Sequence, residues 1–337
     1  MSSKWWLVLA ASGVLALGVA ACGDDDDDDS GGSGDTPSGL SGTIRVDGSS
    51  TVAPLTQAIA EGFNEENPDV DVTVGTSGTG GGFEKFCAGE TDISDASRAI
   101  EEDEVAACQA GGIAYEEIQV ANDALTVVTN PENPVTCLTV EQLKSVWEPK
   151  SAINSWSNIE GLDPPFDAEL ALYGPGTDSG TFDYFTEAIN GEEGASRTDY
   201  NDVGEDDNAT VTGVSGAEGG MGYFGYSFFV ENEGTVNAVE IDSGGGCVAP
   251  SVETAQDGTY TPLSRALFVY PSAAALENEA VDGFLQYYLD NINDVAEQVG
   301  FIPLTEEQLS ASQQKLEGLI GGGGGGTDTS GGTETAG

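Results

Sequence analysis

The stretch GTIRVDGSSTVAPLTQAIAEGFNEENPDVDVTV, residues 42–74, decides the fold. Residues 42–50 predict a strand that ends in a Gly-Ser turn. Residues 51–68 predict a helix with Pro54 in its first turn, where proline is tolerated. Residues 69–82 predict a second strand that runs into a glycine loop. A strand, a helix and a strand in this order are the repeating unit of α/β folds with parallel sheets.

The alternation of strands and helices continues along the chain. Helices are expected over residues 83–89, 101–108, 139–147 and 275–300, and the last should break near Asn291. Extended segments are expected over residues 91–100, 115–133, 170–173 and 262–271. Residues 216–232 predict a tight turn and a helix. This rhythm predicts an α/β fold built on a parallel sheet. If the extended runs 124–129 and 267–270 both cross between two lobes, the chain has a discontinuous two-lobed plan with a cleft between the lobes.

Charge and composition exclude several classes of function. The 337 residues include 9 Lys and Arg against 59 Asp and Glu, a net charge of −50. Nucleic acids and anionic membrane surfaces need basic patches, so neither is expected as a partner. The acidity is interpreted as a solubility adaptation to high salt, where screening makes self-repulsion tolerable. The absence of histidine excludes a Ser-His-Asp triad and histidine-ligated metals, and we expect no metal or other cofactor.

The two ends of the chain predict processing and tethering segments. Residues 1–21 are typical of a lipoprotein signal peptide: Lys4 precedes an apolar run too short to span a membrane, and the small residues before Cys22 look like a bacterial lipobox. Cys22 would then carry the lipid, and ordinary secretion is the alternative. Residues 22–41, with their aspartate run, predict an acidic disordered tether. Residues 320–337 predict a disordered, glycine-rich tail.

The remaining cysteines predict disulfides. Cys87, Cys108, Cys137 and Cys247 are an even number, and the signal peptide places them in an oxidising compartment. Three pairings are possible, of which the local pair Cys87–Cys108 together with Cys137–Cys247 is favoured. Because the sequence has no CxxC motif, we expect no zinc site built from them.

Four loops share one design, in which a strand ends, Ser or Thr residues follow with Gly or Asp, and a helix begins. They are Gly48-Ser49-Ser50-Thr51, Ser77-Gly78-Thr79-Gly80, Ser94-Asp95-Ala96-Ser97-Arg98 and Thr177-Asp178-Ser179-Gly180-Thr181. Loops at the carboxyl ends of parallel strands face one crevice. Hydroxyls and helix starts there, with Arg98 as the cation, would hold a small tetrahedral oxyanion. Ordinary helix caps and turns are the alternative.

Two further features of these loops bear on the ligand. The glycine loop lacks the Gly-Lys-Ser/Thr of a nucleotide P-loop. Phosphate at neutral pH carries a proton and sulfate does not, so a carboxylate that accepts the proton would favour phosphate and repel sulfate. Asp95 and Asp178 are the candidates for that carboxylate.

Four segments together resemble the substrate-binding lipoproteins of ABC-type phosphate importers. They are VDGSSTVAPLTQAIAEGFNEENPDVDVTV (46–74), GTSGTGGGFEKFCAGETDISDASRAI (75–100), GPGTDSGTFDYFTEAI (174–189) and GGMGYFGYSFF (219–229). The resemblance covers residues 42–310 and implies a two-lobed periplasmic-binding-protein fold of type II, with two crossover strands and orthophosphate held dehydrated between the lobes. Residues 42–123 and 263–319 would form lobe 1 with the second crossover, and 124–262 lobe 2 with the first.

The resemblance also implies a biological setting. The protein would be anchored by its lipid on the extracytoplasmic side of the cell membrane, would act as a monomer without catalysis, and would deliver inorganic phosphate to permease subunits.

The resemblance assigns binding residues loop by loop, and with the loop analysis it gives one candidate set. Ser50 and Thr51 match the first loop of the family, Ser77 to Gly80 the second, and Ser179 to Thr181 its Ser-Gly-Thr signature. The set of expected phosphate-binding residues is Ser50, Thr51, Ser77, Gly78, Thr79, Asp95, Ser97, Arg98, Asp178, Ser179, Gly180 and Thr181.

The chain departs from the family pattern at two positions. Pro175 stands where some members have an arginine, which leaves Arg98 as the expected cation. Ser97 stands where some members have an acceptor aspartate, with Asp95 two residues earlier.

Three other functions remain as alternatives. The protein could bind another oxyanion, such as sulfate or molybdate. It could be a surface phosphatase-like hydrolase with Asp178 or Ser179 as nucleophile, although a chain without histidine has little machinery for acid–base catalysis. It could be a purely structural surface protein, in which the hydroxyl loops would be coincidental.

Overall fold

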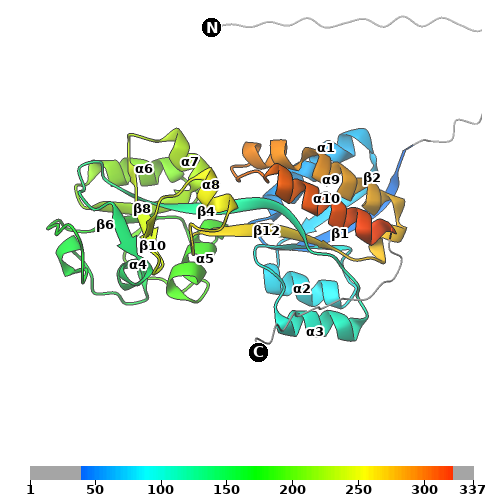
Figure 1. The fold of residues 1–337 in the computed structure, drawn as a ribbon, viewed down its shortest axis with the longest axis horizontal. Coiled ribbons are helices and arrows are strands. Elements are labelled where there is room, and N and C mark those ends of the chain that lie inside the picture. Colours follow the sequence, from blue (N-terminus) through cyan, green and yellow to red (C-terminus); the bar gives the residue numbers. More distant parts are fainter. Residues whose placement is uncertain (1–38, 322–337) are drawn as a thin grey trace, which may run out of the picture. The chain divides into compact units, whose positions relative to one another are not determined.

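The computed structural model describes residues 39–321. These residues form two lobes joined by two long strands (Figure 1). The predicted signal peptide, the lipid-bearing Cys22, nearly all of the tether and the tail after residue 321 lie outside the described residues. Within residues 39–321, none of the helices has the length and apolar character needed to cross a membrane.

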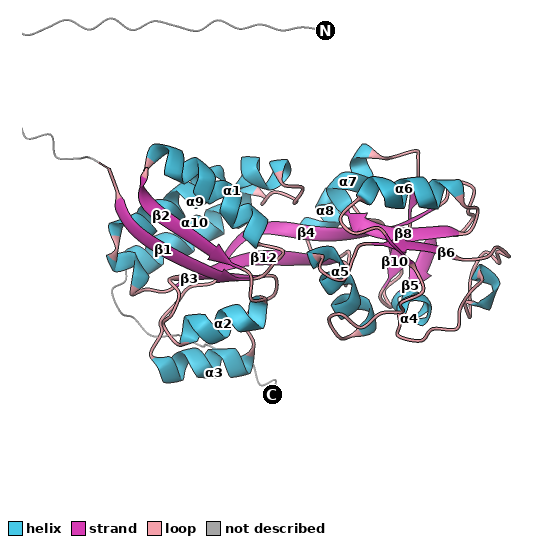
Figure 2. Cartoon of the chain, turned by 180° about the vertical axis from the view of Figure 1, so that it is seen from behind, coloured by secondary structure: helices cyan, strands magenta, loops and turns pink. Residues whose placement is uncertain are grey.

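Lobe 1 is a strand–helix repeat completed by two C-terminal helices. Its elements are β1 (Ser41–Gly48), α1 (Ala53–Glu66), β2 (Asp69–Gly75), α2 (Thr79–Cys87), β3 (Ile93–Ala96), α3 (Glu102–Gly111), a 3-10 turn at Ala275–Glu277, α9 (Glu279–Gln298) and α10 (Glu306–Gly321). The strand β1 lies between β2 and β3 and pairs in parallel with both, as predicted. The helices α1, α9 and α10 cover one face of the sheet, and α2 and α3 lie on the other (Figure 2).

The sequence of α1 explains how lobe 1 packs. Leu55, Ile59 and Phe63 recur every four residues, which places them on one face of the helix, and all three are buried. Phe63 contacts Phe284 of α9 edge to face, with ring centroids 5.4 Å apart. The first and last parts of the described chain therefore share one hydrophobic core.

Lobe 2 is built from the middle of the chain. Its elements are β5 (Cys137–Thr139), α4 (Val140–Trp147), a 3-10 turn at Trp156–Asn158, β6 (Ala171–Gly174), α5 (Gly180–Phe185), a π-helical turn at Thr186–Asn190, β7 (Asn201–Asp202), α6 (Asp207–Gly216), β8 (Gly220–Gly225), α7 (Tyr226–Glu231), β9 (Asn237–Ala238), β10 (Glu240–Asp242), β11 (Cys247–Val248) and α8 (Val252–Gln256). Thr139 caps α4 as predicted, because its Oγ1 accepts a hydrogen bond from the Gln142 N–H at 3.1 Å. The core centres on Trp147, Phe185 and Tyr223, and the last two rings stack at 3.7 Å.

The strands β4 (Ile118–Thr129) and β12 (Ser264–Pro271) connect the lobes. They pair with each other in antiparallel fashion from Ser264 opposite Ala124 to Val269 opposite Ile118. Beyond Ala124, β4 pairs with β8 of lobe 2, while β12 pairs with β3 of lobe 1. One sheet, in the order β2-β1-β3-β12-β4-β8-β6-β7, therefore runs through both lobes.

Three expectations about the elements need correction. The sheet is mixed rather than parallel, because the two connecting strands run in opposite directions. Residues 216–232 contain the buried strand β8 before the helix α7. Its glycines replace the usual apolar alternation because α6 packs closely against the strand: a Cβ on Gly220 would lie 2.4 Å from the Val214 carbonyl oxygen, and one on Gly222 would lie 2.6 Å from Thr210 Cγ2. The helix α9 is unbroken at Asn291, whose Nδ2 donates to the Tyr287 carbonyl one turn earlier.

The disulfide pairing favoured from the sequence is confirmed. Cys87 at the end of α2 bonds to Cys108 in α3, and Cys137 in β5 bonds to Cys247 in β11. The first bond joins residues 21 positions apart, and the second joins residues 110 positions apart. Each disulfide bond joins elements within one lobe, so neither bond restricts the movement of one lobe against the other.

Removing the disulfides should destabilise the protein unequally. Replacing Cys137 and Cys247 by Ala should lower the free energy of unfolding by about 4–5 kcal/mol, and replacing Cys87 and Cys108 by about 3 kcal/mol, because the longer loop gains more entropy in the unfolded chain. Guanidinium melts of both double variants, in one high-salt buffer, measure this. Equal losses, or none, would contradict the loop-length argument.

Candidate functional site

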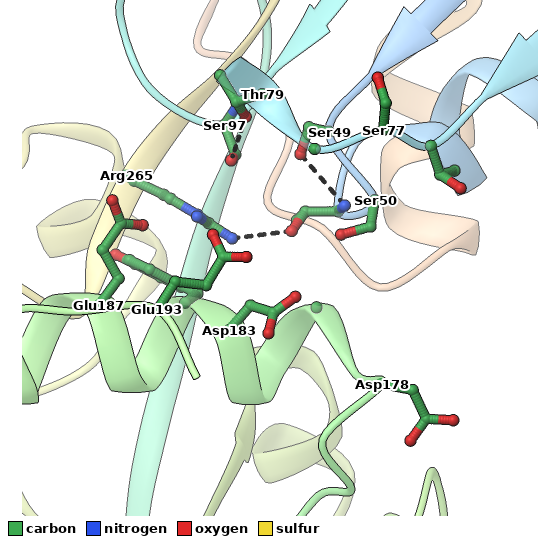
Figure 3. Close-up of a pocket in the computed structure, with 15 residues that line it drawn as sticks. Ser49, Ser50, Ser77, Thr79, Ser97, Asp178, Asp183, Glu187, Glu193 and Arg265 are labelled. Atoms are coloured by element: carbon green, nitrogen blue, oxygen red, sulfur yellow. Dashed lines mark hydrogen bonds between the residues drawn. The ribbon is translucent and has the colours of Figure 1, made fainter. Parts of the chain in front are cut away.

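A polar pocket of about 380 Å³ lies between the lobes, beside the connecting strands (Figure 3). Its lining consists of Ser49, Ser50, Thr51, Thr76, Ser77, Gly78, Thr79, Ser97, Asp178, Gly180, Asp183, Tyr184, Glu187, Glu193 and Arg265. Three of the four predicted hydroxyl loops enter it from lobe 1 and the fourth from lobe 2. Among these lining residues, Arg265 carries the single positive charge.

The first loop presents a hydroxyl donor because of how Ser49 bonds the turn that precedes α1. Ser49 Oγ accepts the N–H groups of Thr51 at 3.2 Å and Val52 at 3.4 Å. Both interactions use oxygen lone pairs, so the Ser49 hydroxyl hydrogen stays available to a ligand. Gly48, just before it, has a φ of +148°, and a Cβ there would lie 2.0 Å from the Asp95 carbonyl oxygen. Only glycine fits at this position.

The second and third loops meet through their hydroxyls. Thr79 Oγ1 accepts the Ser97 N–H at 3.2 Å and lies 3.1 Å from Ser97 Oγ. Ser77 is held differently, because its N–H and its hydroxyl both contact Asp47 Oδ1, at 3.0 and 2.5 Å. Lys85 Nζ contacts the other oxygen of the same carboxylate at 2.5 Å. The Ser77 hydroxyl hydrogen is therefore committed to Asp47.

The fourth loop brings lobe 2 against lobe 1. A Cβ on Gly180 would lie 3.1 Å from Thr51 Oγ1, so the start of α5 touches the first loop directly. Ser179 caps α5, with its Oγ accepting the Thr181 N–H at 3.3 Å. Ser179 and Thr181 line a second space between the lobes, which also contacts Asp123.

Arg265 comes from the connecting strand β12 and is held on three sides. Its Nη2 donates to Thr51 Oγ1 at 3.0 Å, and its Nε lies 3.2 Å from Asp123 Oδ2. Its guanidinium lies over the ring of Tyr184, 3.5 Å from the centroid. The side chains of Arg265 and Asp123 are only 13% and 10% exposed, so little water competes for the ion pair. Burial raises the pKa of Asp123, and the charge of Arg265 opposes that rise.

Carboxylates surround this single cation. Asp178, Asp183, Glu187 and Glu193 all line the pocket, as Figure 3 shows below and beside Arg265. Burial, and then the charge of Glu193, raise the pKa of Asp183, with Arg265 acting in the opposite direction. The pocket therefore carries more negative than positive charge, which disfavours a highly charged anion and favours a protonated one.

The structure brings most of the expected residues together. Ser50, Thr51, Ser77, Gly78, Thr79, Ser97, Asp178 and Gly180 line the pocket. Arg98 does not, because its guanidinium turns to α3 and donates twice to Glu104, at 2.8 Å each. Its Nε also lies 3.2 Å from Glu101. The positive charge expected from Arg98 is supplied in the pocket by Arg265.

Sequence reasoning missed Arg265 together with Asp183, Tyr184, Glu187 and Glu193. Arg265 lies in an extended run outside every hydroxyl loop, and its partner Asp123 is 142 residues away. The available signal was one basic residue in an apolar strand of a chain with only 9 Lys and Arg. Asp183 and Glu187 follow the Ser-Gly-Thr turn on the same helical segment, and Glu193 lies in the turn after it, where all three look like ordinary surface charges.

Asp95, expected as an acceptor for the ligand proton, lies behind the pocket. It has no exposed surface, and neither of its carboxyl oxygens has a hydrogen-bond partner within the described chain. Its carbonyl oxygen accepts the Ser49 N–H at 2.9 Å and so supports the first loop. Burial raises the pKa of Asp95 to about 8; the nearby Thr56 hydroxyl opposes this rise, and the charge of Asp47 adds to it. Asp95 is therefore a buried support of the loop, and its raised pKa favours the neutral carboxyl group at pH 7.

Known proteins resemble this chain over most of its length. A family model described as a PBP superfamily domain matches residues 33–291. Protein SphX of Synechococcus elongatus is 44% identical over 276 residues, which is 81% of each chain. The phosphate-binding protein PstS of Staphylococcus saprophyticus is 36% identical, over 94% of this chain and 96% of its own.

Solved structures share the architecture. A crystal structure described as a possible phosphate binding protein from Planctomyces limnophilus is 45% identical, with a TM-score of 0.80, and covers 83% of this chain and 99% of its own. An ABC-type phosphate transport receptor from Vibrio cholerae has a TM-score of 0.63 over 77% of this chain and 99% of its own. At 22% identity, this second likeness supports the two-lobed fold alone.

Replacing Asp95 by Asn should change how stability depends on pH. The folded protein holds the Asp95 proton up to a pH of about 8, whereas the unfolded chain loses it near pH 4. The wild-type free energy of unfolding therefore loses up to about 1.4 kcal/mol per pH unit between these values through this group. The variant lacks that loss, so its free energy of unfolding relative to that of the wild type should increase as the pH rises.

Urea melts of both proteins at about pH 5, pH 6.5 and pH 8 give the difference between their free energies of unfolding. Groups that titrate in the same way in both proteins cancel in this difference. A difference that stays constant across this range would show that Asp95 does not hold its proton.

Proposed function

The chain belongs to the PBP superfamily, and within it to the family of the PstS phosphate-binding proteins, and from this premise we propose that it captures inorganic phosphate and delivers it to an ABC-type import permease. Phosphate would occupy the pocket beside Arg265. Lobe 1 would comprise residues 42–123 and 263–319, and lobe 2 residues 124–262. The protein would work as a monomer on the extracytoplasmic side of the membrane, anchored through Cys22.

One observation carries the proposal: hydrogen-bond donors from both lobes converge around one arginine whose side chain is only 13% exposed. Ser49 and Thr51 each have an oxygen already occupied as an acceptor, so each can donate its hydroxyl hydrogen. The starts of α2 and α5 add N–H groups without a helical partner. Phosphate, with four oxygens in tetrahedral directions, suits such a set of donors.

Arg265 would bind the anion at little cost of rearrangement. Asp123, Thr51 and the ring of Tyr184 already fix its guanidinium in one orientation. An arginine held in this way loses little side-chain entropy when a ligand binds. Its planar fork offers paired donors to an oxyanion.

The carboxylates of the pocket support phosphate as the ligand over sulfate. A phosphate at neutral pH carries one or two protons, whereas sulfate carries none. Asp178 and Asp183 would meet two bare charges on sulfate, and this repulsion favours the protonated anion. The same carboxylates make the site unsuited to more highly charged ligands.

A binding function is better supported than hydrolysis. Ser179, the serine considered as a nucleophile, acts as the cap of α5 and lines the second space rather than the pocket with Arg265. Within the described residues, its Oγ has the Thr181 N–H as its hydrogen-bond partner and no carboxylate that could act as a base.

Calorimetry on the refolded full chain tests the proposal. The protein is unfolded and refolded to release any bound anion and then titrated in high-salt buffer with phosphate and, separately, with sulfate. We expect tight binding of phosphate and binding of sulfate at least about 100-fold weaker, because like-charge contacts cost several kcal/mol. Equal affinities would make the protein a general oxyanion binder, and no heat from either anion would reject the assignment.

Exchanging each arginine for glutamine separates the two candidate cations. Arg265→Gln should weaken phosphate binding by about 2–4 kcal/mol, roughly 30- to 1,000-fold, because it removes the charge that faces the anion and leaves Asp123 unpaired. Arg98→Gln is the matched control, since Arg98 pairs with Glu104 outside the pocket. Its phosphate affinity should equal that of the wild type. The reverse result would return the role to Arg98.

A further inference from the structure

The segment that follows α9, residues 299–304, links the two lobes beside the connecting strands. Ile302 exchanges two backbone hydrogen bonds with Asn122 of β4, each 2.9 Å long. The side chain of Ile302 is buried in the core of lobe 2, whereas α9 itself packs in the core of lobe 1. This segment therefore lies where one lobe passes into the other.

A serine of lobe 2 is hydrogen-bonded to this segment. Ser227, in the first turn of α7, donates its hydroxyl hydrogen to the Gly300 carbonyl oxygen at 2.7 Å, a distance typical of a good O–H···O bond. The two residues come this close because position 300 is a glycine. Its φ is +89°, and a Cβ there would lie 3.0 Å from Ser227 Oγ.

This hydrogen bond spans the part of β4 that bends if the lobes move apart. The strand pairs with β12 as far as Ala124 and with β8 from Leu125 onward. Gly300 lies just before the pairing with Asn122, on the lobe 1 side of this change of partner, and Ser227 lies just after the end of β8, on the lobe 2 side. Since the donor and acceptor are 2.7 Å apart, a further separation of about 1 Å ends the bond.

The pocket needs both lobes in place to surround an anion. The start of α5 in lobe 2 touches the first loop of lobe 1, where a Cβ on Gly180 would lie 3.1 Å from Thr51 Oγ1. An anion beside Arg265 contacts groups from both lobes. Binding therefore favours the closed arrangement, in which the lobes are as close as they are here, and release favours their separation.

We propose that the hydrogen bond from Ser227 to Gly300 is a latch that stabilises the closed arrangement without touching the ligand. Ser227 and Gly300 line the second space between the lobes and are absent from the lining of the pocket with Arg265. Phe228 of lobe 2 and Phe301 of lobe 1 line that second space too, so the latch lies beside apolar rings from both lobes.

The inference rests on the proposed function, because the latch acts on phosphate binding through the fraction of the protein that is closed. A ligand that needs the closed arrangement binds with an apparent affinity reduced by the fraction that is open. Loss of the latch should therefore weaken binding even though no group that contacts phosphate has changed.

The test compares two serine variants of the full chain with the wild type. Ser227→Ala removes the latch, and calorimetry with inorganic phosphate should show binding about three- to tenfold weaker. Ser312→Ala is the matched control: Ser312 Oγ also donates to a carbonyl oxygen at 2.7 Å, that of Gln119, but within lobe 1. Its phosphate affinity should equal that of the wild type.

Small-angle X-ray scattering gives a second measurement on the same proteins. Without ligand, Ser227→Ala should have a larger radius of gyration than the wild type and Ser312→Ala, because more of it is open. The segments outside the two lobes are identical in all three proteins, so their contribution to the comparison cancels. At saturating phosphate the three radii should agree.

Three results decide against the latch or against the function. Unchanged phosphate affinity in Ser227→Ala, in protein shown to be folded by its melting curve, rejects the latch. Equal weakening in Ser312→Ala also rejects it, because loss of any such hydrogen bond would then suffice. If the wild type binds no phosphate, the proposed function fails, and the scattering without ligand then decides on the latch alone, with equal radii rejecting it.

Discussion

The ion pair between Arg265 and Asp123 is the interaction on which the pocket depends. The two residues lie directly opposite each other on the strands that connect the lobes. Because both side chains are largely buried, each needs the other as a counter-charge. The guanidinium then reaches Thr51 of lobe 1 and stacks on Tyr184 of lobe 2. One side chain on a connecting strand thus contacts both walls of the pocket.

A chain with a net charge of −50 can hold an anion because binding is decided at short range. Charges separated by more than about 10 Å are largely screened in salt, whereas contacts inside a closed pocket are not. The donors there are hydroxyls, backbone N–H groups and one arginine, so the site uses little positive charge. Under the proposed function, the carboxylates around Arg265 would make a proton on the ligand an advantage.

Support behind the pocket is as important as the lining itself. Asp47 fixes Ser77 by accepting a hydrogen bond from its hydroxyl group. Asp95 supports the first loop through its backbone carbonyl, which accepts the Ser49 N–H, while its carboxyl group stays buried. Both aspartates lie at the end of neighbouring strands, β1 and β3, which pair in parallel. The loops that follow these strands therefore start from a rigid edge, which is why small hydroxyl side chains can be placed with defined hydrogen-bond directions.

The sequence by itself determined the features that depend on nearby residues. The βα repeats of lobe 1, the hydroxyl loops, the cap at Thr139 and the disulfide Cys87–Cys108 follow from local spacing, capping and turn chemistry. The long-range disulfide Cys137–Cys247 follows only as the pair that remains once the local one is assigned. Only the tertiary structure decided which arginine enters the pocket. Arg98 meets Glu104 six residues away, whereas Arg265 meets Asp123 across 142 residues. Antiparallel pairing of two distant strands creates that contact, and no local pattern encodes it. The glycine-rich strand β8 escaped prediction for the same reason, since Gly220 and Gly222 are required by the close approach of Val214 and Thr210 in α6 rather than by their neighbours in the chain.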